Sequence, residues 1–283
     1  MGPLPDFRNC TSLTRVRLDN NLFVGNISDS FGVHPHLYFF DMSFNRLYGE
    51  LSPNWGECKN LLVLKISRNI ISGKIAPEIG HLTRLGQLDL SSNKLAGEIP
   101  KKLGNLSTLL RLNLSGNQIT GHVPVEIGKL INLESLDLSA NRLIGSIPAQ
   151  LGQCSKLLSV NLSRNSLNGS IPTHIGDLVY LQARLDLSHN SISGLIPPQL
   201  GRLIMLEILN LSHNMITGSI PLSLTEMVSL TSLDFSYNKL EGVVPNNRAF
   251  RNAASPQAFR NNKRLCGELQ GLIPCHRSYT SKG

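Results

Sequence analysis

The chain has 283 residues, of which 41% are hydrophobic and 16% are charged, and its formal net charge is +8 at pH 7. No stretch approaches the roughly 18 consecutive apolar residues that span a bilayer, so the sequence predicts no membrane helix. The positive charge gives little support to a nucleic-acid partner, because seven basic residues and one acidic residue lie from 246 onward and no nucleic-acid motif accompanies them.

The chain begins inside a repeating pattern. Residues 2–5 read Gly-x-Leu-Pro, which looks like the end of a unit that recurs further on. We therefore expect residues 1–12 to be a partial repeat and the chain to be part of a larger protein. The start has no hydrophobic region typical of a signal peptide.

A unit of 24 residues fills the sequence from 13 to 245, and its marker is the Asn of a Leu-x-Leu-x-x-Asn phrase. Because a unit of this length cannot bury a core alone, the units must stack into a curved solenoid with one long concave surface. One spacing of 25 predicts a local bulge at 180–185, just before a strand. The ten marker residues are Asn21, Asn45, Asn69, Asn93, Asn117, Asn141, Asn165, Asn190, Asn214 and Asn238.

Each unit predicts a short strand, a turn and an irregular return segment. Before Asn117, Leu112 and Leu114 alternate with polar residues, as in a half-buried strand. The Asn side chain should turn inward and bond to unpaired backbone groups. A Gly follows every marker Asn by four residues, where we expect positive φ or close backbone approach. The Ile-Pro or Val-Pro of most units comes after this Gly, and its proline stops further strand pairing. The rest of the unit is short and partly apolar, which predicts 3₁₀ or irregular backbone.

Three cysteines share one position of the unit, thirteen residues after the marker position, where other units have Leu. We therefore expect Cys10, Cys58 and Cys154 to be core residues. Positions two units apart lie about 10 Å apart, beyond the roughly 7 Å reach of a disulfide, so they should be free thiols. Cys266 and Cys275 enclose a short loop outside the repeats, which predicts a disulfide and an oxidising compartment. We expect no metal site, because further ligands at suitable spacing are lacking.

The phrase Leu-x-x-Leu-x-Leu-Ser-x-Asn-x-Leu-x-Gly-x-Ile-Pro-x-x-Leu-Gly-x-Leu resembles the plant-specific class of leucine-rich repeat over residues 2–245. The resemblance implies an α/β repeat solenoid, a right-handed superhelix with a concave parallel sheet and a 3₁₀ or irregular convex side. Such repeats are similar to those in the ectodomains of plant receptor-like kinases, which bind peptides, steroids or microbial fragments. The segment 241–275 resembles the cap of those receptors, so we expect a C-terminal cap and a basic juxtamembrane tail over 246–283.

The strand positions six, four and two residues before each marker Asn should face the concave surface. In later units these positions carry a plain row of Ser, Asp and Asn, but the first three units break the pattern. Exposed aromatic residues flanked by cations suit recognition of an extended peptide or an acidic group, with Arg as the donor to a carboxylate. Divergence without function near the end of a repeat array is the alternative. The predicted ligand-binding residues are Arg15, Arg17, Tyr38, Phe39, Asp41, Val63 and Lys65.

A second surface lies in the last repeats. His189 and His213 precede the marker Asn in consecutive units, about 5 Å apart. They could form a pH-sensitive pair, and a solvated edge is the alternative. The resemblance implies that a co-receptor ectodomain docks on the last repeats and the cap, in the region of His213 and Tyr237.

Seven Asn-x-Ser/Thr sequences are potential glycosylation sites. Three of them, Asn113, Asn161 and Asn210, belong to the repeat's own phrase and arise from its composition. The four that we expect to carry glycans in a secreted parent protein are Asn9, Asn26, Asn105 and Asn168.

The repeats and the resemblance predict a ligand-binding ectodomain fragment of a plant membrane receptor-like kinase, on the extracellular side of the plasma membrane and paired with a co-receptor kinase. We expect no catalytic residues and no cofactor, because the sequence has no phosphate-cradling Gly loop, catalytic Asp phrase or nucleophile with a base. Any kinase or membrane anchor would lie outside this chain. The alternatives are a secreted protein similar to polygalacturonase inhibitors and a truncated gene remnant.

Overall fold

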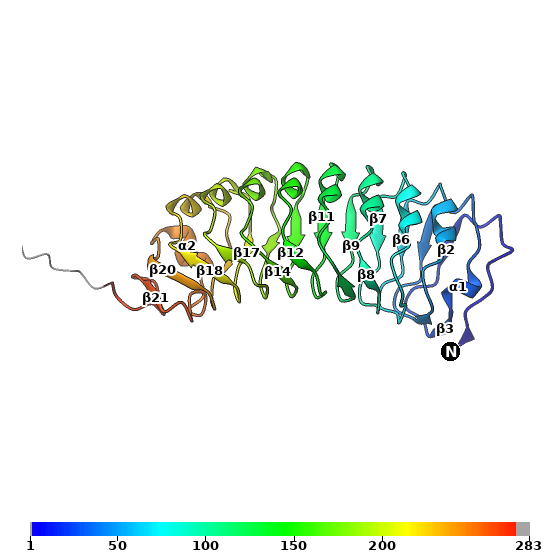
Figure 1. Cartoon of the computed structure of the whole chain (residues 1–283), viewed down its shortest axis with the longest axis horizontal. Coiled ribbons are helices and arrows are strands. Elements are labelled where there is room, and N and C mark those ends of the chain that lie inside the picture. Colours follow the sequence, from blue (N-terminus) through cyan, green and yellow to red (C-terminus); the bar gives the residue numbers. More distant parts are fainter. Residues whose placement is uncertain (1, 276–283) are drawn as a thin grey trace, which may run out of the picture.

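The computed structural model describes residues 2–275 and shows an elongated, arched stack of repeats (Figure 1). In these residues, one short strand from each repeat joins a ten-stranded parallel sheet that runs along the stack. The strands pair position by position, as Leu112 does with Leu136. The sheet consists of β2 (Arg15–Arg17), β4 (Phe39–Asp41), β6 (Val63–Lys65), β7 (Gln87–Asp89), β9 (Arg111–Asn113), β11 (Ser135–Asp137), β13 (Ser159–Asn161), β15 (Arg184–Asp186), β17 (Ile208–Asn210) and β19 (Ser232–Asp234).

Short 3₁₀ helices line the arched edge of the stack in Figure 1, which confirms the predicted return segment. Most begin directly after a proline, as η4 does after Pro124. Within residues 2–275, no helix has the length and apolar character needed to cross a bilayer. The helices are η1 (Pro53–Glu57), η2 (Pro77–His81), η3 (Lys101–Asn105), η4 (Val125–Lys129), η5 (Ala149–Gln153), η6 (Thr173–Asp177), η7 (Pro198–Arg202) and η8 (Leu222–Glu226), with α1 (Ile27–Ser30) in the first repeat and α2 (Arg248–Ala253) near the end.

A second set of short strands follows the marker Asn residues, where the sequence had predicted only a turn. The extended residues that follow one marker Asn pair in parallel with those of the neighbouring repeat. Gln118, for example, pairs with Ala96 of the preceding repeat. The strands that follow a marker Asn are β3 (Phe23–Asn26), β5 (Arg46–Tyr48), β8 (Ala96–Glu98), β10 (Gln118–Thr120), β12 (Ile144–Ser146), β14 (Ser166–Asn168), β16 (Ser193–Gly194), β18 (Met215–Gly218) and β20 (Lys239–Val243). Two further strands extend the set at its ends, since β1 (Gly2–Pro3) pairs with β3 and β21 (Arg264–Cys266) pairs with β20.

The marker Asn residues tie each repeat to its neighbours. Asn117 donates from Nδ2 to the carbonyl oxygens of Leu90 and Leu114, both at 3.0 Å, and its Oδ1 accepts the N–H of Leu95 at 3.0 Å. Because Leu90 and Leu95 belong to the preceding repeat, one buried side chain satisfies backbone groups of two repeats. The inward role predicted for the marker Asn is therefore confirmed at Asn117, but it was wrong for Asn21, which is exposed and bonds only to Leu18 O and Asp19 O of its own turn.

The residue directly before each marker Asn adopts the left-handed backbone conformation, which the sequence did not predict. His189 and Tyr237, for example, both have φ of 54°. This conformation disfavours most side chains, but here the backbone N–H bonds to the next repeat, as His189 N does to Ser212 O at 3.0 Å. The backbone hydrogen bonds between repeats therefore hold this conformation with many different side chains at the position.

The core is a continuous column of buried Leu and Ile side chains, closed at its first repeats by an aromatic cluster in which Phe31 stacks on Trp55 at 3.7 Å between ring centroids. Cys58 and Cys154 are buried free thiols, as predicted. The prediction of a core position was wrong for Cys10, which is free but exposed. Cys10 lies in the turns that precede β2, outside the complete repeats of this chain.

The extra residue of the 25-residue unit is absorbed just before β15, as predicted. Gln182 and Ala183 donate their N–H groups to Leu158 O at 3.1 and 2.8 Å, as Glu134 and Ser135 donate theirs to Leu110 O in an ordinary repeat. Ser135 begins its strand, however, whereas Ala183 is the extra residue that precedes β15. The strand then resumes in register, with Arg184 opposite Ser159. The insertion therefore leaves the sheet continuous.

Candidate functional site

The predicted ligand-binding residues gather on three adjacent strands near the N-terminal end of the sheet. Strands β2, β4 and β6 place them in two rows across the sheet. Tyr38 directly precedes β4 and is 43% exposed. One row is Arg15, Phe39 and Val63, and the other is Arg17, Asp41 and Lys65.

The first row begins with a cation over an aromatic ring. The guanidinium carbon of Arg15 lies 4.8 Å from the ring centroid of Phe39, within the range of a cation–π contact. Arg15 remains exposed and Phe39 is half-buried. The pair therefore combines a charge and an apolar face that a ligand can contact together.

The second row alternates in charge. Arg17, Asp41 and Lys65 are register partners, and Asp89 of β7 follows Lys65. Within the described chain, Lys65 makes no ion pair shorter than 4.0 Å, so its ammonium group is available. An extended ligand across these strands would meet cationic and anionic groups in turn.

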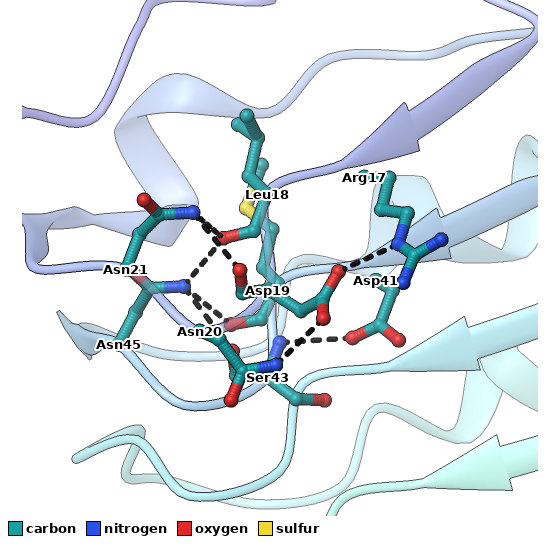
Figure 2. A network of polar contacts seen from close by, with 9 residues as sticks. Arg17, Leu18, Asp19, Asn20, Asn21, Asp41, Ser43 and Asn45 are labelled. Carbon is teal, nitrogen blue, oxygen red and sulfur yellow. Dashed lines mark hydrogen bonds and ion pairs between the residues drawn. The ribbon is translucent and has the colours of Figure 1, made fainter.

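Asp19 is not among the predicted ligand-binding residues, although the structure pairs it with Arg17. Figure 2 shows Arg17 Nε donating to Asp19 Oδ1 at 3.0 Å, while Asn20 donates to the other carboxylate oxygen at 2.7 Å. The hydrogen bond from Arg17, followed by that from Asn20, lowers the pKa of Asp19. Arg17 is still 65% exposed, so the ion pair orients its guanidinium without covering it.

Asp41 has a structural role as well as a surface position. Its Oδ1 accepts the N–H of Ser43 at 3.0 Å, as Figure 2 shows, and Asp41 is only 9% exposed. Asp137 makes the same contact with Ser139 in a later repeat. Asp41 therefore stabilises the turn through Oδ1, and only its second carboxylate oxygen is free to contact a ligand.

Phe44 and Arg68, which are not among the predicted site residues, form a second cation–π pair. The guanidinium carbon of Arg68 lies 5.0 Å from the Phe44 ring centroid, and Phe44 is 47% exposed. Both residues directly precede a marker Asn and have positive φ. The available signal was an aromatic residue directly before a marker Asn, but the direction of its side chain depends on the unpredicted backbone conformation.

The two histidines and Tyr237 form a stacked column at the other end of the sheet. The ring centroids of His189 and His213 are 4.1 Å apart and those of His213 and Tyr237 are 4.0 Å apart. The guanidinium carbon of Arg260 lies 4.9 Å from the Tyr237 centroid. We call His189, His213, Tyr237 and Arg260 the ring column. The column is separate from the N-terminal site, with several repeats between them.

The cap contains the predicted cysteine pair. Cys266 and Cys275 form a disulfide with a Cα–Cα separation of 4.9 Å. Cys266 lies in β21, which pairs with β20 of the last repeat, so the loop is attached to the solenoid through the sheet. The rest of the predicted tail, including Arg277 and Lys282, lies outside the described residues.

The four favoured glycosylation sites differ in their surroundings. Asn9, Asn105 and Asn168 are exposed. Asn26 instead caps α1, accepting the N–H of Ser28 at 3.0 Å and donating to Asp29 at 2.8 Å. Among residues 2–275, no group of three His, Cys, Asp or Glu side chains is placed to hold a metal ion.

Family comparisons agree with the repeat architecture. One model of the leucine-rich repeat matches residues 183–240. A second leucine-rich repeat model matches residues 84–106, 108–130, 132–154 and 156–178. No curated protein matches the chain in sequence.

Several solved structures are similar to the chain. The LRR ectodomain of the plant membrane receptor kinase GASSHO1/SCHENGEN3 from Arabidopsis thaliana, in complex with CASPARIAN STRIP INTEGRITY FACTOR 2, is 40% identical with a TM-score of 0.88, over 95% of this chain and 32% of that one. The structure of PEPR1 with AtPEP1 is 35% identical to this chain and has a TM-score of 0.87. The similarity covers 94% of this chain and 37% of that one.

The Arabidopsis receptor kinase HAESA, in complex with the peptide hormone IDA and the co-receptor SERK1, is 33% identical with a TM-score of 0.76, over 96% of this chain and 49% of that one. The chain therefore spans about a third to a half of the length of these structures. In all three cases the similarity extends over nearly all of the present chain.

Proposed function

Because the chain belongs to the leucine-rich repeat family, we propose that it is a ligand-binding part of the ectodomain of a plant membrane receptor-like kinase. Three similar structures support this proposal, since each holds a named partner: CASPARIAN STRIP INTEGRITY FACTOR 2, AtPEP1 or the peptide hormone IDA. The chain covers less than half of each, so the ligand, the kinase and the extracellular location of the whole protein all belong to the proposal.

The observation that carries the proposal is the exposed face of β2, β4 and β6. An extended peptide advances about 3.3 Å per residue and adjacent strands lie about 4.8 Å apart, so three peptide residues span two strand spacings. A carboxylate of the peptide would bind the guanidinium groups of Arg15 and Arg17, which donate in a fork. Apolar side chains further along would contact Phe39 and Val63, beside the free ammonium group of Lys65.

A co-receptor is the second part of the proposal. We place its contact on the last repeats, in the region of His213 and Tyr237. HAESA was solved with the co-receptor SERK1, which supports a partner of this class for a similar ectodomain. A protein docking there would leave the N-terminal ligand site uncovered, because the two regions lie at opposite ends of the sheet.

The test is calorimetric titration of the chain with CASPARIAN STRIP INTEGRITY FACTOR 2, AtPEP1 and IDA peptides, followed by selection from a displayed library of extended peptides. For any peptide that binds, Arg17→Glu with Lys65→Glu should weaken binding about 30-fold or more, as expected for central interface residues. Lys94→Glu with Arg142→Glu is the matched control, since it makes the same charge change at exposed positions outside these strands.

Each outcome has a distinct meaning. Binding that the first double variant loses and the control keeps supports both the function and the site. Binding that both variants keep removes the site assignment but leaves the ligand-binding role. If no peptide binds and the library yields none, the proposed function fails for this part of the ectodomain.

A further inference from the structure

The ring column is held at fixed spacing by the solenoid backbone. His189, His213 and Tyr237 occupy the same position of consecutive repeats and share a φ of 54°. Their backbone N–H groups bond to Ser212 O, Ser236 O and Arg260 O at 2.9–3.0 Å. The rings are nearly parallel, with interplanar angles of 12° and 14°. The backbone positions that carry the rings therefore keep a fixed spacing from one repeat to the next.

Charged groups lie at both ends of the column and on strands beside it. Arg164 occupies the equivalent position one repeat before His189, and Arg260 covers the far face of Tyr237. Asp186 and Asp234 lie on β15 and β19, while the intervening strand β17 carries the neutral Asn210. The column is thus bounded by a cation at each end, with separated carboxylates beside it.

This environment opposes a charge on His189. His189 is exposed as a residue, but partial desolvation of its ring lowers its pKa most, and the charges of His213 and Arg164 lower it further. Asp186 and Asp234 act in the opposite direction but do not reverse the shift. A neutral imidazole stacks on its neighbour without repulsion, whereas an imidazolium ring 4.1 Å from a second protonated ring would be repelled by it.

We propose that His189, His213 and Tyr237 act as one proton-linked unit, in which protonation of the histidines changes the surroundings of Tyr237 two repeats from His189. The edge of the last repeats then changes from a neutral ring stack to a cationic ridge as the pH falls. The signal reaches Tyr237 through the ring of His213, which stacks on it. This inference concerns the chain alone and does not depend on a ligand or a co-receptor.

The test is NMR spectroscopy of the chain with labelled His and Tyr rings between pH 8 and pH 4.5. The His189 ring signal should move with a midpoint below about 6.5, the ordinary value for histidine, and the Tyr237 ring signals should move with the same midpoint. A Tyr237 response that begins only at the acidic end of this range would instead report a carboxylate and would contradict the proposal.

His213→Asn tests the link directly. Asn already occupies this position as Asn20 and Asn261, with φ of 56° and 58°, so the backbone can be retained. The variant should make the Tyr237 signals independent of pH above 5 and bring the His189 midpoint closer to the ordinary value. His81→Asn, at an exposed histidine of η2, is the matched control and should leave the Tyr237 response unchanged.

Two results would overturn the inference. Tyr237 signals that stay constant in the unmodified chain between pH 8 and 5 would show that the rings titrate independently. An unchanged Tyr237 response in folded His213→Asn would show that the middle ring carries no coupling. Should that variant not fold, the measurement on the unmodified chain still decides.

Discussion

Leu240 donates its backbone N–H to Oδ1 of Asn262 at 2.9 Å, and this bond makes the C-terminal cap an eleventh step of the Asn ladder. The Asn262 amide also donates to Phe235 O at 2.9 Å and Phe259 O at 3.1 Å. These are the contacts that Asn117 makes in the middle of the solenoid. The cap should therefore unfold together with the last repeats.

Asn117→Ala should lower the free energy of unfolding by about 1–3 kcal/mol, because backbone groups of two repeats lose their buried partner. Asn262→Ala should have a similar effect. Asn21→Ala is the matched control, since Asn21 is exposed and its amide bonds only to Leu18 O and Asp19 O within its own turn. Urea denaturation measures all three, and equal losses for Asn21 and Asn117 would contradict the ladder account.

Gly80→Ala should destabilise the solenoid, whereas Gly86→Ala should not. A Cβ atom at Gly80 would lie 2.3 Å from the backbone oxygen of Lys102, so two neighbouring 3₁₀ helices would have to separate. At Gly86 the nearest atom is Leu62 O at 3.6 Å, an ordinary contact. We expect a loss of about 1–3 kcal/mol for Gly80→Ala and less than about 1 kcal/mol in either direction for Gly86→Ala. Thermal unfolding of the two variants measures this difference, and similar midpoints would argue against close packing of the 3₁₀ helices.

Removing the cap disulfide should reduce stability locally. Cys266→Ser with Cys275→Ser opens a loop of sequence separation 9, for which the chain-entropy relation gives about 2–3 kcal/mol. Cys10→Ser is the matched control, because Cys10 is an exposed free thiol. Hydrogen exchange should show faster exchange in β21 and β20 of the double variant and no change in the control. Uniform acceleration along the whole solenoid would mean that the disulfide acts globally rather than on the cap.

Glycosylation should separate the exposed sequons from those on the strand face. Secreted from plant cells behind an added signal peptide, the chain should carry glycans at Asn9, Asn105 and Asn168, with lower occupancy at Asn26. The strand-face residues Asn113, Asn161 and Asn210 accept hydrogen bonds from the serine hydroxyl two residues later at 2.7–2.8 Å, with neighbouring strands close on both sides. Glycopeptide mass spectrometry measures the occupancy at each site, and high occupancy at the strand-face residues would reverse this ranking.

The regular features could be predicted because they repeat. Each marker Asn, each following Gly and each core Leu recurs at fixed spacing, and a stack of identical units has few other ways to bury them. The left-handed position could not be predicted, since it accepts Phe44, Arg68, Ala140 and Tyr237 alike and leaves no signature in composition. The eleventh Asn was overlooked, although its spacing of 24 from Asn238 was visible in the sequence.

The candidate sites depended on contacts that spacing alone does not reveal. The rows on β2, β4 and β6 follow from the repeat, so Arg15 and Phe39 could be expected to be neighbours. The pairing of Arg17 with Asp19 depends on side-chain conformation within one strand end. Likewise, the spacing predicted that His189 and His213 are close, but their parallel stacking follows from the backbone conformation before each marker Asn.

At the left-handed position before each marker Asn, the stability of the fold depends little on which side chain is present. Its backbone is fixed by main-chain bonds to the next repeat, and its side chain lies outside the core. Each repeat has one such position, and its residue can therefore be substituted while the buried Leu and Asn residues stay the same. Along this row of positions the repeats have a nearly constant spacing, so charged side chains and rings can be placed at defined distances from one another.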